Sequence, residues 1–137
     1  MLDVASKVSK YGPSRSTFSN IPKKYTLWEE ACKTPLVIKA PGLTQPGSRC
    51  PSPVNLLDLY PTLSELAGLP INTENEGNSI VPLLKDVNTE WDIPSLTTMG
   101  FNRHTVRNKK WCYISYGGNQ EELYNHDVDT MEFTNLA

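Results

Sequence analysis

A run of apolar residues in the first third of the chain constrains its fold more than any other stretch. Residues 35–40, PLVIKA, are apolar at every position but one, and Pro41-Gly42 follows at once. A short apolar run bounded by turn-forming residues is typical of a strand that is buried on both faces, as in a parallel sheet. We therefore predict a buried strand at residues 36–40, a loop at its carboxyl end, and an α/β fold.

The next element is predicted to be a helix, in the stretch DLYPTLSELAGLP. Asp58 is placed to cap its amino end, and Gly68 comes directly after its last apolar residue. Leu59, Leu63 and Leu66 fall on one side of a helix with 3.6 residues per turn. We expect this apolar side to pack on the sheet.

The last third of the chain changes to a shorter period. Three runs rich in aromatic and β-branched residues follow one another from Thr97 onward: TTMGFNRHTVRN, KKWCYISYGG and EELYNH. Gly117-Gly118-Asn119, between the second and third runs, is a strong turn signal. This pattern predicts a small antiparallel meander beside the α/β part.

These patterns divide a chain of 137 residues into three segments. Residues 1–22 are polar and carry no sustained period of 2 or 3.6, so we expect a poorly ordered segment there. Residues 23–95 are assigned to the α/β part. Residues 96–137 are assigned to the small antiparallel subdomain and a tail.

Charge and hydropathy argue against two classes of partner. The chain has 13 basic and 15 acidic residues, a formal net charge of -2, which gives no overall attraction to nucleic acid or an anionic membrane. No stretch approaches the 18 apolar residues of a membrane span, and the first residues lack the apolar run of an export signal. Basic residues do cluster beside two aromatic ones, but their period of 2 favours the solvated face of a strand over a nucleic-acid site. The residues are Arg103, Arg107, Lys109, Lys110, Trp111 and Tyr113.

Cysteine and acidic residues give no metal pattern in the sequence. Cys32, Cys50 and Cys112 lie far apart without a paired spacing, so we interpret them as ordinary thiols. His126, with Asp127 and Asp129, offers too few ligands for calcium, and we interpret this group as turn-forming. No metal site is therefore predicted.

Four segments, taken in order, resemble the carboxyl-terminal part of the sulfatase family, in its iduronate-sulfatase-like and choline-sulfatase-like branch. They are KKYTLWEEACKTPLVIKAPG, PVNLLDLYPTLSELAGLP, EGNSIVPLLKD and VRNKKWCYISYGGNQEELYNHDVDTMEFTNLA. The resemblance spans about residues 23–137. It implies the carboxyl-terminal part of an alkaline-phosphatase-like α/β fold, ending in a small antiparallel β subdomain.

The resemblance also implies a chemistry, most of which lies outside this sequence. Sulfatases hydrolyse sulfate esters with a formylglycine made from a Cys or Ser in the motif C/S-x-P-x-R, and with a calcium ion. Tyr11-Gly12-Pro13-Ser14-Arg15 fits that motif except at its first position, where tyrosine cannot be converted to formylglycine. The calcium-binding segment of the family, Asp-His-Gly, is not found in residues 1–22. We therefore predict no catalytic residue and no metal ligand in this chain, although a complete relative would carry both cofactors.

Two residues are candidates for binding the sulfate group. Lys24 aligns with a family lysine that donates to a sulfate oxygen, and Glu29 either orients it or begins a turn. Without the resemblance, the favoured interpretation of Lys24 is a solvated surface lysine beside Lys23. His104, at the start of a strand near the expected pocket, is either a ligand for a sulfate or sugar hydroxyl or an ordinary edge-strand histidine.

The sequence as a whole is thus predicted to be a carboxyl-terminal sulfatase fragment, inactive alone, whose substrate is a sulfated carbohydrate or related sulfate ester. Its partners would be that substrate and the missing amino-terminal sulfatase half. Two alternatives stay open: a non-catalytic binding module or relic, and a phosphate or phosphonate ester hydrolase of the same superfamily. A periplasmic or extracellular location is typical of the family, although this sequence shows no signal peptide.

Overall fold

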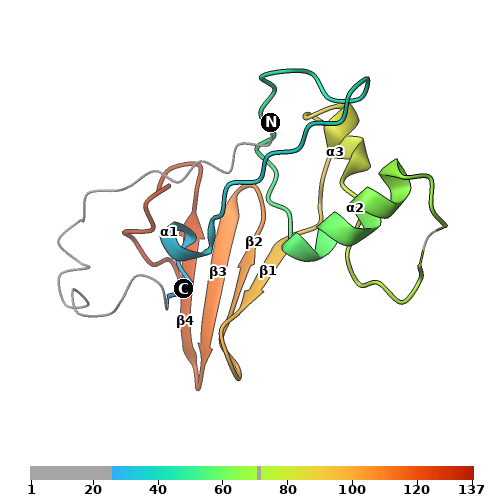
Figure 1. Cartoon of the computed structure of the whole chain (residues 1–137). Helices are drawn as coiled ribbons and strands as arrows, with labels where there is room; N and C mark the ends of the chain where they lie inside the picture. Colours follow the sequence, from blue (N-terminus) through green and yellow to red (C-terminus); the bar gives the residue numbers. More distant parts are fainter. Residues whose placement is uncertain (1–25, 71) are drawn as a thin grey trace.

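The computed structural model describes residues 26–70 and 72–137 (Figure 1). The predictions for residues 1–22, for the motif at Tyr11 and for Lys24 lie outside these residues. Three helices occur in the described part: α1 (Glu29–Cys32), α2 (Leu59–Leu66), which a 3₁₀ turn (Leu56–Asp58) precedes, and α3 (Val81–Lys85). None of the helices searched in this part is long and apolar enough to span a bilayer.

Four strands form the predicted meander. They are β1 (Ser95–Thr98), β2 (His104–Arg107), β3 (Trp111–Gly117) and β4 (Gln120–Asn125). Each pairs antiparallel with the next, in the order β1-β2-β3-β4. The turn between β3 and β4 holds Gly117, Gly118 and Asn119 at φ values of 78°, 60° and 66°, the left-handed conformations that favour glycine and asparagine. The meander and its turn are therefore confirmed.

The sheet has one buried and one open face because side chains alternate along each strand. Cys112 and Ile114 on β3 are buried, whereas Trp111 and Tyr113, which alternate with them, are exposed. On β2 the register places Thr105 opposite Ile114, on the buried side. The alternate residues of β2, His104 and Val106, therefore lie on the open face.

The segment around α1 covers the buried face. Leu27 is 1% exposed and packs with Cys112, Ile114 and Tyr124 in one apolar cluster. Trp28 and Cys32 lie at its margin. A four-residue helix cannot be stable alone, so this packing and its polar contacts hold it in place.

A second apolar cluster lies away from the sheet, around α3. Its buried members are Cys50, Ile80, Leu83 and Leu84. The strand predicted at residues 36–40 packs here but is not a strand. Leu36 and Ile38 contact the cluster, whereas Val37 between them is 60% exposed. The described part of the chain supplies no neighbouring strand for this segment, which is extended but unpaired.

The described residues do not contain the parallel sheet on which the leucine side of α2 was predicted to pack, so this packing stays a prediction. Leu63 is 60% exposed and Leu66 is 38% exposed. The side that is buried is polar: Asp58 is 1% exposed and Thr62 is completely buried. These two residues bind the loop that leads into α3, and the leucines therefore face outward.

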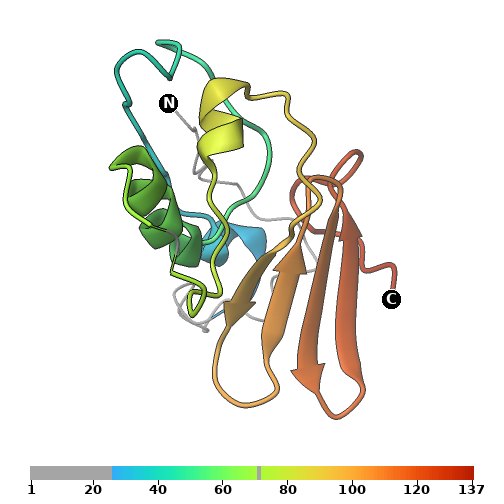
Figure 2. The same ribbon diagram turned by 90° about the vertical axis from the view of Figure 1, so that its right-hand side faces the viewer.

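Figure 2 shows the resulting arrangement, with the sheet on one side and α2 and α3 on the other. Asn55 joins the two sides: its Oδ1 accepts the backbone N–H of Leu96 at 2.8 Å. Because Leu96 lies on β1, the edge strand of the sheet is held against the start of α2.

Candidate functional site

His104 lies at the first position of β2, on the open face of the sheet. Its Nδ1 is 3.0 Å from the Oγ1 of Thr98, directly opposite on β1. When the threonine hydroxyl donates to Nδ1, the ring proton sits on Nε2. The side chain then offers an N–H donor to a group outside the sheet, as an anion-binding role requires.

Glu29 begins α1, so the prediction that it starts a turn is confirmed. Its Oε1 lies 3.2 Å from Lys33 Nζ, and its Oε2 lies 3.2 Å from Arg107 Nε. The carboxylate is thus directed at the helix itself and at the sheet. Its alternative role, the orientation of Lys24, stays a prediction.

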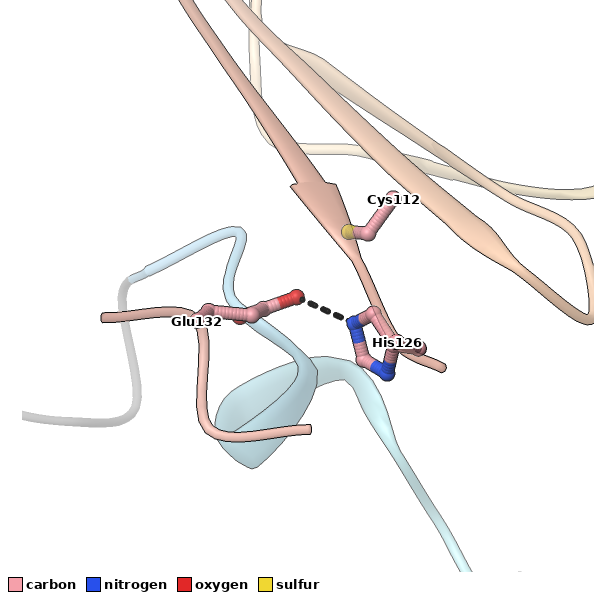
Figure 3. A group of neighbouring side chains, drawn as sticks. All are labelled: Cys112, His126 and Glu132. Atoms are coloured by element: carbon pink, nitrogen blue, oxygen red, sulfur yellow. Dashed lines mark hydrogen bonds and ion pairs between the residues drawn. The ribbon is translucent and has the colours of Figure 1, made fainter. Parts of the chain in front are cut away.

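A buried polar cluster joins the sheet to both ends of the described chain (Figure 3). His126 Nε2 lies 3.1 Å from Glu132 Oε1, and Cys112 stands beside them. Arg107 Nη2 lies 2.9 Å from His126 Nδ1. Glu132 Oε2 accepts the backbone N–H of Glu29 at 2.9 Å, which links the cluster to α1.

The neighbours of His126 define its tautomer. An arginine can only donate hydrogen bonds, so Nδ1 must accept the bond from Arg107. The proton of the neutral ring is therefore on Nε2, which donates it to the Glu132 carboxylate. The ring is fixed from both sides.

This tautomer does not suit a metal ion, although Cys112, His126 and Glu132 have ligand atoms within 4.8 Å of one another. Nε2 carries the proton that a metal would have to replace, and the Arg107 guanidinium adds a positive charge next to the ring. Calcium in particular prefers oxygen ligands to thiol and imidazole. The cluster therefore fits neither zinc nor the calcium of a sulfatase.

The cysteines near the cluster are poor nucleophiles because they are protonated. Burial raises the pKa of Cys112 well above its usual range, and the nearby Glu132 carboxylate adds to this effect. Burial also raises the pKa of Cys32 to about 11. All three cysteines are free thiols, in agreement with the prediction.

Glu132 reaches the cluster from an unusual backbone conformation. The φ angle of Glu132 is 55°, and the residue is only 3% exposed. Asp129 shapes the loop around it, because its Oδ2 accepts the backbone N–H groups of Phe133 and Thr134, both at 2.8 Å. The turn-forming role predicted for Asp129 is confirmed.

The cluster corrects the interpretation of Arg107 and adds buried contacts to that of His126. Arg107 was expected on the solvated face of its strand, but it lies on the buried face between Glu29 and His126. His126 lies in the turn after β4, as expected, but it is only 9% exposed and binds Arg107 and Glu132. The hydrogen-bond partners of Arg107 and His126 lie up to 78 residues away in the sequence, and no local sequence pattern predicts such pairs.

A second carboxylate organises the aromatic residues beside α1. Glu122 Oε2 accepts hydrogen bonds from Trp28 Nε1 at 2.8 Å and from the Tyr124 hydroxyl at 2.9 Å. The Tyr116 hydroxyl also donates to it, at 3.4 Å. One oxygen thus has three donors, which makes Glu122 a structural anchor for this segment.

The sequence matches the family described as N-sulphoglucosamine sulphohydrolase, C-terminal, over residues 20–137. A sulfatase of Formosa agariphila is 38% identical over 114 residues, a match that covers 83% of this chain and 22% of that protein. A choline-sulfatase of Rhizobium meliloti is 31% identical over 122 residues, which covers 83% of this chain and 23% of that protein. The chain thus spans less than a quarter of the length of these curated relatives.

Solved structures agree in fold. A phosphonate monoester hydrolase from Silicibacter pomeroyi superposes with a TM-score of 0.67 at 24% identity, over 83% of this chain and 26% of that one. BT4656, solved with its substrate D-glucosamine-2-N,6-O-disulfate, superposes with a TM-score of 0.58 at 19% identity, over 74% of this chain and 23% of that one. At such identities the likeness shows the fold alone.

Structural likeness defines the class by its fold, the carboxyl-terminal part of an alkaline-phosphatase-like fold. The match over residues 20–137 narrows this class, and the chain belongs to the sulfatase family, as its carboxyl-terminal part.

Proposed function

We propose that this chain is the carboxyl-terminal part of a sulfuric ester hydrolase and that it contributes substrate contacts rather than the nucleophile. The observation that carries the proposal is the 38% identity to the Formosa agariphila sulfatase across 83% of the chain. In the described residues, the buried Cys112, His126 and Glu132 support the fold and are closed to a substrate. The reaction itself therefore belongs to residues outside this cluster.

Two residues would carry the substrate contacts. His104 directs an N–H donor away from the sheet when Thr98 donates to its other nitrogen. Lys24, by its family position, would donate to a sulfate oxygen. Hydrogen bonds to a sulfate group involve a charged acceptor and are worth about 1.5–3 kcal/mol each, enough for about a tenfold effect on binding.

The substrate class proposed is a sulfated carbohydrate or a related sulfate ester. It is supported by the family match and by BT4656, whose substrate is a disulfated glucosamine. Formylglycine and calcium would come from the remaining part of the enzyme. In keeping with the family, we propose that the complete protein works in the periplasm or outside the cell.

A chimera tests this proposal. The chain replaces the matched 114 residues of the Formosa agariphila sulfatase, and hydrolysis of 4-nitrophenyl sulfate and 4-nitrophenyl phenylphosphonate is measured. We expect the sulfate ester to be the better substrate in kcat/KM. Preference for the phosphonate ester would favour the second hydrolase class, and a folded chimera that hydrolyses neither ester would favour a non-catalytic module.

Substitution of the two binding residues refines the test. In the chimera, His104→Ala and Lys24→Ala should each raise KM about tenfold, because each removes a hydrogen bond to the sulfate. Lys109→Ala serves as the control, since Lys109 is an exposed lysine beyond the end of β2. An unchanged KM in both variants would contradict the proposed contacts.

A further inference from the structure

The loop that joins β1 to β2 presents one large aromatic side chain to its surroundings. Phe101 is 91% exposed, more than any other large hydrophobic residue in the described part of the chain. In Figure 2 the β1–β2 and β3–β4 loops lie together at the lower end of the sheet, away from α2 and α3. The ring of Phe101 therefore projects from a protruding end of the molecule.

The backbone on both sides of Phe101 is held in an uncommon conformation. Gly100 and Asn102 have φ angles of 78° and 55°, and the left-handed region is unfavourable for a residue with a side chain, such as Asn102. The Met99 N–H closes the loop by donating to the Arg103 carbonyl at 2.9 Å. Gly117 of the neighbouring loop supports it, because a Cβ there would lie only 3.2 Å from Asn102 Cβ. Such conformations persist where surrounding contacts impose them, and they are frequent at ligand-binding loops.

The same hairpin carries His104 at its base. Thr98 and His104 form the strand pair next to this loop, and the Thr98 hydroxyl lies 3.0 Å from His104 Nδ1. Phe101 and His104 are three residues apart, so their Cα atoms lie within about 11 Å of each other. One short hairpin thus offers both a hydrogen-bond donor and an aromatic ring. A sulfate ester of a ring compound has the two matching parts, an anionic group and an apolar ring face.

The surroundings of Phe101 favour a small ring over a protein partner. The other exposed residues of the two loops are glycine or polar: Gly100, Asn102, Arg103, Gly118, Asn119 and Gln120. A stable protein interface takes about 20–30 residues from each partner and has an apolar core. A single aromatic ring among polar groups instead matches a sugar ring, whose C–H face packs on the aromatic face while its hydroxyl groups bind polar neighbours.

We propose that Phe101 is a substrate-binding residue, whose ring packs on the ring that bears the sulfate group while His104 binds the sulfate itself. This inference rests on the proposed function. It narrows the substrate class to sulfate esters of cyclic compounds, sugars or aryl groups, because an acyclic sulfate ester has no ring face for Phe101 to cover.

Two sulfate esters that differ in the ring test the contact. Binding of 4-nitrophenyl sulfate and of methyl sulfate is measured by calorimetry on the chimera, with its formylglycine precursor replaced by alanine so that neither ester is hydrolysed. Phe101→Ala should weaken binding of 4-nitrophenyl sulfate about tenfold and change that of methyl sulfate less than about twofold. His104→Ala should weaken binding of both esters, since both carry the sulfate group.

Two further variants are controls. Phe101→Tyr keeps the aromatic ring and should bind 4-nitrophenyl sulfate within about twofold of the parent. Val128→Ala truncates an apolar residue that is 83% exposed in the loop after β4, and it should bind both esters as the parent does. Circular dichroism verifies that every variant is folded.

Equal effects of Phe101→Ala on the two esters, or no effect on 4-nitrophenyl sulfate, would overturn the proposed contact. A Phe101→Tyr variant as weak as Phe101→Ala would do the same, as would a change of oligomeric state in Phe101→Ala, which would assign the ring to a protein interface. A His104→Ala variant that binds both esters like its parent would contradict the proposed function instead.

Discussion

Arg107 shows how one side chain joins three segments of this molecule. Its Nε binds Glu29 on α1, and its Nη2 binds His126 after β4. The side chain is 17% exposed, so these contacts are only partly screened by water. Because Arg107 itself lies on β2, it ties α1 and the tail to the buried face of the sheet.

We expect Arg107→Met to lower the free energy of unfolding by about 2–3 kcal/mol, because it leaves the half-buried Glu29 and the buried His126 without the Arg107 donor. Urea denaturation followed by circular dichroism measures this loss. The matched variant Lys109→Met removes an exposed charge and should change stability by less than about 0.5 kcal/mol. Equal stability of the two variants would show that the cluster contributes nothing.

Alkaline pH should destabilise the fold through its buried thiols. Burial raises the pKa of Cys32 from 9.0 to about 11, so the folded state keeps a proton that the unfolded state releases. The contribution is fully present below pH 9 and is lost as the pH rises from 9 to about 11. Burial raises the pKa of Cys112, Tyr116 and Tyr124 in the same direction.

The prediction is a free energy of unfolding that falls between pH 9 and 11, with a shallower fall in Cys32→Ala. Urea denaturation at a series of pH values measures both slopes. Val128→Ser, at an exposed and non-ionisable position, should keep the slope of the parent chain. A Cys32→Ala slope equal to that of the parent would contradict the assignment.

At the scale of elements, α2 depends on a polar contact more than on its leucines. Thr62 Oγ1 accepts the N–H of Ile80 and lies within hydrogen-bond distance of the Asp58 carbonyl oxygen. Thr62→Val keeps the shape but leaves the buried Ile80 N–H without an acceptor. We expect a loss of about 1–3 kcal/mol, measured by urea denaturation.

The control for this variant is Thr134→Val, at an exposed threonine near the carboxyl end. Its hydroxyl has no hydrogen bond within the described residues, so stability should change by less than about 0.5 kcal/mol. A Thr62→Val variant as stable as this control would show that α2 is held by other contacts.

How far the sequence predicted these elements depends on where their partners lie. The meander β1–β4 was predicted because each strand pairs with its sequence neighbour and the Gly117-Gly118-Asn119 turn is local. The strand at residues 36–40 was predicted from its apolar run, but the described chain provides no partner strand for it. The burial of Thr62 and Asp58 was missed because both residues find their partners in the loop before α3.

The family resemblance pointed to His104, and its place at the start of a strand is confirmed, whereas its role in binding stays a prediction. It lies on the open face of β2, an inner strand of the sheet. The cluster of Arg107, His126 and Glu132 escaped prediction, because its members come from β2, from the end of β4 and from the tail. Only the folded chain brings these side chains together.

At the scale of the whole molecule, the side that holds the four-stranded sheet makes many buried contacts, whereas the side that holds α2 leaves apolar side chains exposed. The sheet, α1 and the tail share buried apolar and polar contacts. Leu56, Leu57 and Leu63 are exposed, and the backbone of residues 34–39 has no hydrogen bond to any described residue, although Leu36 and Ile38 pack beside α3. This asymmetry agrees with a chain that is the carboxyl-terminal part of a larger protein.

Sulfate-ester hydrolysis by the chimera, with and without His104→Ala, tests this account most directly. Both proteins are compared at the same concentration, and circular dichroism verifies that both are folded. We predict that the parent chimera hydrolyses 4-nitrophenyl sulfate and that His104→Ala raises its KM about tenfold. An inactive but folded parent, or a His104→Ala variant with the KM of its parent, would contradict the account.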